Sequence, residues 1–188
     1  MRKVILDLTL TLDGYIEGPN GEIDWIAADG HTDFADVLID ILDGIDAIFY
    51  GRVSYELWGN YRPDTDASPK LQKAYDLLHS KTKYVFSTTL QQPKNENVIV
   101  ISSDIEATVN KILNETGGNI WLYGGGKLTT TFVNLDLIDI YRLAFQPVIL
   151  GEGKPLFENI KNRVGLKLLS SKAGGDGVVM LRYAKVSA

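Results

Sequence analysis

Three consecutive glycines, 124–126, stand between an apolar strand pattern and a helical pattern. Glycine lets a backbone approach a phosphate closely, and a helix N-terminus offers N–H donors and positive potential. The segment does not match a P-loop, because Trp121 occupies its first glycine position and Leu128 replaces the magnesium-binding Ser or Thr. Thr129 stands where the dinucleotide fingerprint needs its third glycine. The glycines alone therefore predict either a phosphate-binding turn or a tight turn without a ligand.

Two further apolar strand patterns end in residues that suit a phosphate. Gly51-Arg52 follows one of them, and Ser87-Thr88 follows the other. Ligands of an open α/β sheet bind outside the carboxyl ends of its strands. Each residue alone is more commonly a solvated surface residue. Together with Lys127 they predict a basic, hydroxyl-rich rim, which suits an adenine nucleotide with a ribose phosphate.

The residues that suggest a substrate site are fewer than those that suggest a phosphate site. Asp13 ends the first strand pattern beside a glycine, where it can orient or protonate a substrate or simply form a turn. Trp25 and Phe34 can wall a flat-ring pocket, although aromatic residues near a helix start are more commonly core. Asp33 is better explained as a capping charge than as a catalyst. We interpret His31, among turn residues, as a surface residue.

The composition excludes several kinds of chemistry. The 188 residues include no cysteine and two histidines far apart, which argues against thiol catalysis, disulfides and a metal site. The net charge of -5 argues against a nucleic-acid partner. Asp7 interrupts the apolar N-terminus before a signal core can form, and no apolar stretch is long enough to span a membrane. We expect a single cytoplasmic domain over residues 1–188.

Hydrophobic periodicity predicts the elements that position these residues. Strand and helix patterns follow the order β-α-β-α-β-β-α-β-α-β-β-β, in which the helices at 53–58 and 69–79 share one position. This order indicates parallel crossovers followed by an antiparallel terminal pair. The predicted helix starts are Thr32 as an N-cap, Ser68 as an N-cap before Pro69, and a capping box of Ser103 with Glu106. The strands are expected at 4–12, 47–50, 84–86, 98–101, 119–123, 139–150, 166–171 and 178–186, and the helices at 34–42, 53–58, 69–79, 105–113 and 127–133.

Four segments resemble the dihydrofolate reductase-like superfamily, most of all the stand-alone form of the riboflavin-biosynthesis reductase (RibD) C-terminal domain. The resemblance covers nearly the whole chain. It implies a three-layer α/β fold, in which helices flank a mixed central sheet of about eight strands with an antiparallel C-terminal hairpin. The segments are T-L-D-G-Y-I (11–16), G-R-V-S-Y-E (51–56), L-Y-G-G-G-K-L (122–128) and P-V-I-L-G-E-G-K-P-L-F (147–157).

The resemblance implies NADPH as the cofactor. It matches Arg52 to the arginine that contacts the 2′-phosphate of the adenosine. It matches Gly124 and Gly125 to the pair that carries the pyrophosphate, usually through a cis peptide. The cofactor-binding residues it implies are Gly51, Arg52, Ser54, Ser87, Thr88, Gly124, Gly125, Gly126, Lys127 and Leu128.

On the substrate side, the resemblance makes Asp13 the catalytic candidate, which orients the substrate or helps to deliver a proton. Trp25 and Phe34 keep the spacing that brackets the pterin-binding acid of dihydrofolate reductases, but Gly30 stands at the acid's position and Asp33 lies only near it. The substrate-binding residues we expect are Trp25, Asp33, Phe34 and Lys154, the last either as a phosphate contact or as a plain loop residue.

The sequence thus predicts an NADPH-dependent reductase that acts by hydride transfer on a small heterocyclic substrate. It is most like 5-amino-6-(5-phosphoribosylamino)uracil reductase of riboflavin biosynthesis. The alternatives are a dihydrofolate or pterin-type reductase and an NADPH-binding protein without turnover. A homodimer through the strand at 139–150 and the terminal hairpin is a further expectation.

Overall fold

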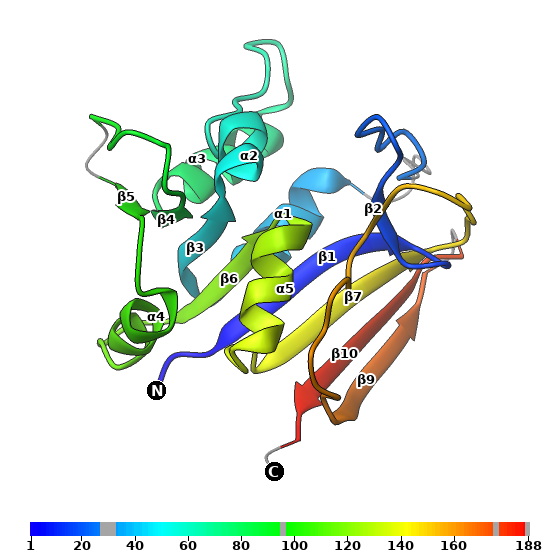
Figure 1. Cartoon of the computed structure of the whole chain (residues 1–188). Coiled ribbons are helices and arrows are strands. Elements are labelled where there is room, and N and C mark those ends of the chain that lie inside the picture. Colours follow the sequence, from blue (N-terminus) through cyan, green and yellow to red (C-terminus); the bar gives the residue numbers. More distant parts are fainter. Residues whose placement is uncertain (27–32, 95–96, 175–176, 187–188) are drawn as a thin grey trace. The chain divides into compact units, whose positions relative to one another are not determined.

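The computed structural model describes residues 1–26, 33–94, 97–174 and 177–186 (Figure 1). Eight strands form a mixed sheet in the order β5-β4-β3-β6-β1-β7-β10-β9, and β2 pairs with β8 in a separate ribbon. The predicted α/β class with a mixed sheet of about eight strands is confirmed. The chain divides into a first unit, residues 1–3 and 32–125, and a second unit, residues 4–31 and 126–188. The single domain over 1–188 stays a prediction.

The first unit contains the parallel part of the sheet. Strand β3 pairs in parallel with β4 and with β6, and β4 pairs in parallel with β5. β3 is buried over nearly its whole length, as expected of a strand covered on both faces. The strands are β3 (Ile45–Gly51), β4 (Thr82–Phe86), β5 (Val98–Ile101) and β6 (Asn119–Gly124), and the helices are α1 (Phe34–Leu42), α2 (Arg52–Ser54), η1 (Tyr55–Gly59), α3 (Pro69–His79) and α4 (Ile105–Leu113).

The helix starts in the first unit test the predicted caps. Ser68 caps α3, since its Oγ accepts a hydrogen bond from the N–H of Leu71, and Pro69 is the first helical residue, as predicted. α1 is capped by Asp33; Thr32 lies outside the described residues.

The capping box of Ser103 with Glu106 is wrong. The N-cap of α4 is Asp104, which has a left-handed backbone (φ 49°) and makes no side-chain cap. Because the helix begins at Ile105, Ser103 lies one residue too early to bond the N–H of the third helical residue.

The predicted helix at 53–58 is α2 followed directly by the π-helix η1. A π-helix has a wider turn than an α-helix and is rare. Tyr55 is buried beneath this turn, and a Cβ on Gly59 would overlap its ring. Gly59 therefore lets the helix close over Tyr55.

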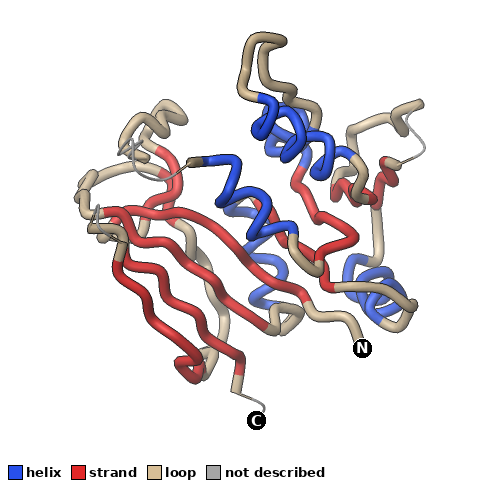
Figure 2. The backbone as a smooth tube through the Cα atoms, turned by 180° about the vertical axis from the view of Figure 1, so that it is seen from behind, coloured by secondary structure: helices blue, strands red, loops and turns tan. Residues whose placement is uncertain are grey.

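The second unit holds the remaining strands of the sheet (Figure 2). β1 pairs in parallel with β7, and β10 pairs antiparallel with both β7 and β9, which confirms the antiparallel C-terminal hairpin. The elements are β1 (Val4–Thr11), β2 (Tyr15–Glu17), α5 (Gly126–Asn134), β7 (Ile140–Gln146), β8 (Lys154–Pro155), β9 (Leu166–Ala173) and β10 (Val179–Lys185).

Two strand ends in the second unit differ from prediction. The strand predicted over 4–12 ends at Thr11, so Leu12 lies outside it and is exposed. The strand predicted over 139–150 ends at Gln146, because Pro147 has no N–H to continue the ladder. The β2–β8 ribbon was not predicted, because runs of two and three residues carry no readable periodicity.

Candidate functional site

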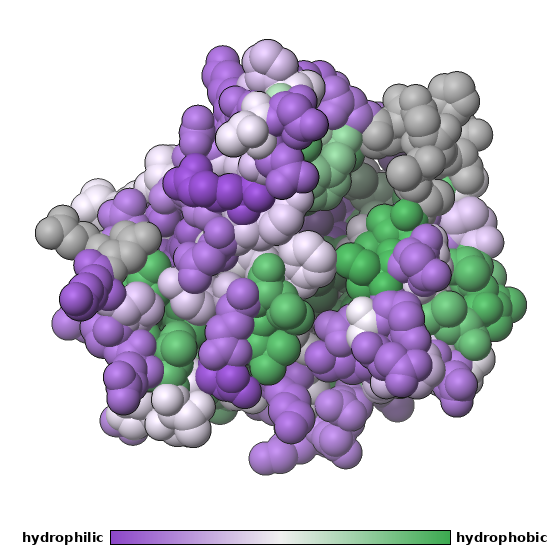
Figure 3. Space-filling model, turned by 90° about the horizontal axis from the view of Figure 1, so that it is seen from above, coloured by the Kyte–Doolittle hydropathy of each residue, from purple (hydrophilic) through white to green (hydrophobic). Residues whose placement is uncertain are grey.

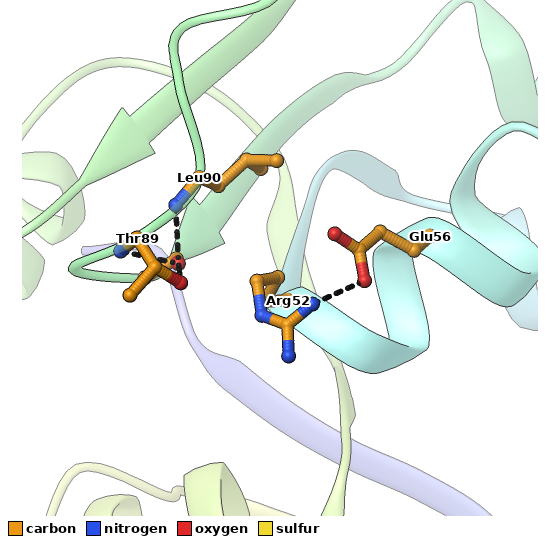
Figure 4. Close-up of polar contacts among 5 residues, drawn as sticks. Arg52, Glu56, Thr89 and Leu90 are labelled. Atoms are coloured by element: carbon orange, nitrogen blue, oxygen red, sulfur yellow. Dashed lines mark hydrogen bonds and ion pairs between the residues drawn. The ribbon is translucent and has the colours of Figure 1, made fainter.

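Arg52 is the first residue of α2, directly after β3 (Figure 4). Its Nη1 lies 2.6 Å from Oε2 of Glu56, one helical turn further on. The side chains of Arg52 and Glu56 are 43% and 44% exposed. The ion pair orients the guanidinium, whose exposed part retains donors that suit an anion such as a phosphate.

Register across β3 and β4 places Ser87 next to Arg52. Gly51 pairs with Phe86, so the two residues that follow leave adjacent strands at the same level. Ser87 Oγ accepts hydrogen bonds from the N–H groups of Thr89 (3.1 Å) and Leu90 (2.9 Å), which closes a turn at the strand end (Figure 4). Thr88 is exposed on this turn.

Gly124 ends the neighbouring strand β6 at the same edge, since Tyr50 of β3 pairs with it, and Gly125 follows directly. Both glycines have a positive φ, 87° and 95°. A Cβ on Gly125 would lie 2.9 Å from Ser54 Oγ. Ser54 and Gly125 thus lie close together within the first unit. The described peptide bonds are all trans, so the implied cis peptide is not found.

Tyr50 is a residue at this edge that the sequence analysis treated only as part of an apolar run. It is fully buried, with its ring 4.8 Å from that of Tyr123 and 6.1 Å from that of Tyr55. Its hydroxyl has no hydrogen-bond partner within the described ranges. Burial raises the pKa of the Tyr50 hydroxyl well above 10.0, so it stays neutral and can donate. The one sequence signal was its place directly before Gly51-Arg52.

Exposed apolar side chains lie on the same helical stretch as Arg52. Val53 and Leu57, one turn apart, are 51% and 60% exposed. The space-filling view shows hydrophobic residues gathered in patches among hydrophilic ones (Figure 3). An apolar surface beside a guanidinium suits a ligand that joins a flat ring to a phosphate.

The second unit holds Gly126, Lys127 and Leu128, which begin α5. A Cβ on Gly126 would lie 3.5 Å from Lys154 Cε and from the carbonyl oxygen of Pro155, so β8 runs close to the helix start. Lys127 is exposed. Leu128 is buried in the core, so only its backbone N–H can serve a ligand.

Asp13 lies in the turn after β1, and its carboxylate accepts hydrogen bonds from three donors of the chain. Oδ1 accepts from Thr11 Oγ1 (2.6 Å) and from the N–H of Leu150 (3.3 Å), and Oδ2 accepts from the N–H of Gly151 (2.8 Å). The hydrogen bond from Thr11 is the main cause that lowers the pKa of Asp13 below its ordinary 3.8. Asp13 is therefore ionised at neutral pH and fastens the segment at 150–151.

The predicted ring-pocket residues fall in different units. Trp25 belongs to the second unit, where its Nε1 donates to the carbonyl of Glu22 (3.1 Å). Phe34 belongs to the first unit, is exposed, and lies 6.5 Å from the ring of Tyr75. The structure describes each within its own unit, so the pair remains a prediction.

Asp33 serves as a cap, as the sequence favoured. Its Oδ1 accepts from the N–H of Ala35 (2.9 Å), and its Oδ2 lies 3.0 Å from Lys70 Nζ. The hydrogen bond from Lys70 is the main cause that lowers the pKa of Asp33.

Lys154 lies on β8 and pairs across the β2–β8 ribbon. Its Nζ is 3.2 Å from Oε2 of Glu17, and both side chains are about a third exposed.

His31 lies outside the described residues. No cluster of three or more potential metal ligands occurs in the described ranges. None of the helices described here has the length and apolarity to cross a membrane.

Comparison with known structures gives the fold first: it is the dihydrofolate reductase-like fold. The chain aligns with a putative riboflavin biosynthesis protein from Shewanella sp. PV-4 (TM-score 0.75, 21% identity, 100% of both chains). It aligns with dihydrofolate reductase from Enterococcus faecalis in complex with NADP(H) (TM-score 0.66, 16% identity, 98% of this chain and 97% of the other). The three-layer fold predicted from the resemblance is confirmed.

A family model identifies the chain more specifically than the fold does. The model of the RibD C-terminal domain matches residues 2–180, and the chain belongs to that family. The protein YyaP of Bacillus subtilis (strain 168) is 47% identical over 182 residues (97% of this chain, 94% of YyaP). A deaminase/5-amino-6-(5-phosphoribosylamino)uracil reductase from Thermotoga maritima has TM-score 0.65 and 18% identity, and this chain matches 57% of that longer protein.

Proposed function

We propose that this protein is an NADPH-dependent reductase that acts by hydride transfer on a small heterocyclic substrate. Its activity would be most like that of 5-amino-6-(5-phosphoribosylamino)uracil reductase. One observation carries the proposal: Arg52 lies half-exposed at the carboxyl edge of the parallel strands, where Ser87 and the glycines at 124–125 also end their strands. The family and its reductase neighbours support the reaction class.

The residues of the first unit fit the adenosine phosphate of the cofactor. Arg52 would form charge-assisted hydrogen bonds to the 2′-phosphate. Gly124 and Gly125 carry no side chain, so the chain can approach a diphosphate closely here. A side chain at Gly125 would be strained and would press on Ser54. The buried Tyr50 hydroxyl lacks a partner among the described residues, which suits a nearby ligand or water. The remaining residues of this set are Gly51, Ser87 and Thr88.

The residues of the second unit are assigned by the family resemblance. The free N–H groups at the start of α5 (Gly126, Lys127, Leu128) would donate to the diphosphate. NADPH, when bound, supplies the hydride. Asp13, being ionised, would orient donors of the substrate rather than release a proton. Lys154 would meet a substrate phosphate after leaving Glu17.

The contacts of Asp33 bear on the pterin alternative. Its carboxylate already caps α1 and pairs with Lys70. A pterin would have to compete with both partners. We therefore favour the riboflavin-type substrate over dihydrofolate; a cofactor-binding protein without turnover remains the third hypothesis.

A homodimer in the cytoplasm completes the proposal. β9 is the outermost strand of the sheet and all eight of its residues are exposed, among them Leu166, Leu168 and Leu169. An exposed edge strand with apolar side chains favours pairing with another chain. A second copy of this chain is the occupant we propose. A monomer by analytical ultracentrifugation would rule this out.

The reductase proposal is tested by titrating the protein with NADPH and with NADH. Quenching of Trp25, Trp58 and Trp121 fluorescence reports binding. Tighter binding of NADPH supports the cofactor assignment, and oxidation of NADPH with the pyrimidine substrate but not with dihydrofolate supports the substrate class. If neither nucleotide binds, the proposal fails.

A further inference from the structure

Lys83 of β4 is a buried lysine, only 1% exposed. Lysine is almost never fully buried unless its ammonium is paired. Its Nζ donates to the carbonyl oxygen of Gly59 (2.6 Å) and to Nδ1 of His79 (2.8 Å). No carboxylate among the described residues forms an ion pair with it. Its partners are therefore a helix carbonyl and an imidazole.

The contacts of His79 determine which of its nitrogens carries the proton. Nε2 lies 2.8 Å from the carbonyl oxygen of Tyr61, which can only accept, so Nε2–H is the donor. Nδ1 then accepts from Lys83 and the ring is neutral. Burial is the main cause that lowers the pKa of His79. Lys83, His79 and the two carbonyls thus form one continuous hydrogen-bonded chain.

The charge of this cluster resides on Lys83 at neutral pH. Burial, with a smaller contribution from Arg62, lowers the pKa of Lys83 to about 8. The other charged group near the pair is Asp76, which bonds Arg62 at 3.2 Å on the exposed side of α3. The neighbouring phenols are those of Tyr61 and Tyr75, whose rings are 5.3 Å apart.

Helix η1 connects Lys83 to Arg52, because Lys83 bonds one of its residues and another of its residues bonds Arg52. Gly59 is the last residue of η1, and a cation at a helix C-terminus interacts favourably with the helix dipole. Glu56, in the first turn of the same helix, holds Arg52. η1 is thus fastened to β4 at its end by Lys83, while Glu56 fixes the guanidinium at its start.

We propose that Lys83 and His79 are positioning residues, which fasten the C-terminal end of η1 and thereby hold Arg52 in place for the adenosine phosphate. This inference rests on the cofactor assignment made above. Lys83 itself does not touch the cofactor. Its effect is expected in the preference for NADPH over NADH, because the two nucleotides differ only at the phosphate that Arg52 would bind.

Protonation of Lys83 strengthens this attachment. A charged donor makes a hydrogen bond roughly twice as strong as a neutral one. The neutral amine keeps both hydrogen bonds, but they lose the strengthening that the positive charge gives. The NADPH preference should therefore fall in part as the pH rises through about 8. The phosphate, with a second pKa of about 6, does not titrate in this range.

The experiment compares the ratio of the dissociation constants for NADH and NADPH in the wild type, Lys83→Met, Lys83→Arg and His79→Phe, from about pH 7 to about pH 9.5. Lys83→Met should lower the preference by roughly fivefold to tenfold and abolish its pH step, since the charge-assisted contact is gone. Lys83→Arg should keep the preference without the step. Lys73→Met, on the exposed surface of α3, is the matched control and should change neither.

The outcomes separate the two proposals. A wild type without NADPH preference at any pH overturns the cofactor assignment and this inference with it. A wild type that prefers NADPH, with the same preference in a folded Lys83→Met variant, overturns the inference alone. If the variants do not fold, the wild-type profile decides: a flat preference across the range overturns the inference, and a fall through about pH 8 supports it.

Discussion

Ser54 Oγ lies 2.9 Å from the position that a Cβ on Gly125 would take. Two segments far apart in the chain, the helix after β3 and the turn after β6, therefore meet at van der Waals distance. Gly125 also has a φ of 95°, a conformation that side chains rarely adopt. The close approach and the backbone conformation together require glycine at this position.

Gly125→Ala should lower the free energy of unfolding by about 1–3 kcal/mol, through backbone strain and contact with Ser54. Chemical unfolding measures the change. Gly44→Ala is the matched control, since Gly44 has a φ of 70° and nothing lies within 4 Å of its Cβ position. The control should lose less stability. Adding Ser54→Ala to Gly125→Ala should recover the difference; no recovery would contradict the contact.

Arg52→Ala should weaken NADPH binding by about 1.5–3 kcal/mol, because a charge-assisted phosphate contact is lost. NADH binding should hardly change. Isothermal titration with both nucleotides gives the two affinities. Arg163→Ala, an exposed arginine elsewhere in the chain, serves as the control for net charge. Equal losses for NADPH and NADH would remove the 2′-phosphate role from Arg52.

Glu56→Gln should strengthen NADPH binding, whereas Arg52→Ala should weaken it. The carboxylate of Glu56 holds Arg52, but it also places a negative charge beside the proposed phosphate site. Glutamine keeps an acceptor for the guanidinium and removes the repulsion, so NADPH should bind about two- to fivefold more tightly. The gain should shrink at high salt, because the pair is partly exposed. Weaker binding would show that orientation by the charge outweighs repulsion.

Asp13→Ala should separate a reductase from a protein that only binds the cofactor. Loss of the orienting carboxylate should lower kcat/KM at least about tenfold while NADPH affinity is kept. Steady-state kinetics and nucleotide titration measure both. A variant with full activity would exclude Asp13 from the reaction.

Asp13 also makes stability depend on pH. Its pKa in the folded protein lies below its ordinary 3.8, chiefly because Thr11 donates to it. The contribution to stability is therefore present above about pH 4 and is lost as the pH falls through the lowered pKa. The difference in unfolding free energy between wild type and Asp13→Asn should be larger at about pH 7 than at about pH 3. A constant difference would contradict the hydrogen-bonded carboxylate.

The sequence by itself determined most elements, because local periodicity and turn chemistry encode them. The helix from Ser68-Pro69 to His79, the strand before Gly51 and the antiparallel hairpin at the C-terminus were all predicted. Short elements such as β2 and β8 were missed, because they exist only by pairing with each other.

Only the tertiary structure decided which polar groups meet. Asp13 bonds the N–H of Gly151, a residue 138 positions away, and no local pattern reveals such a contact. Lys83 lies just before the strand predicted at 84–86 and no pattern singled it out, yet its amine is buried against Gly59 and His79. Burial and long-range hydrogen bonds depend on how elements pack, so the sequence predicted the strand ends that carry Arg52 and the glycines but not the contacts that hold them.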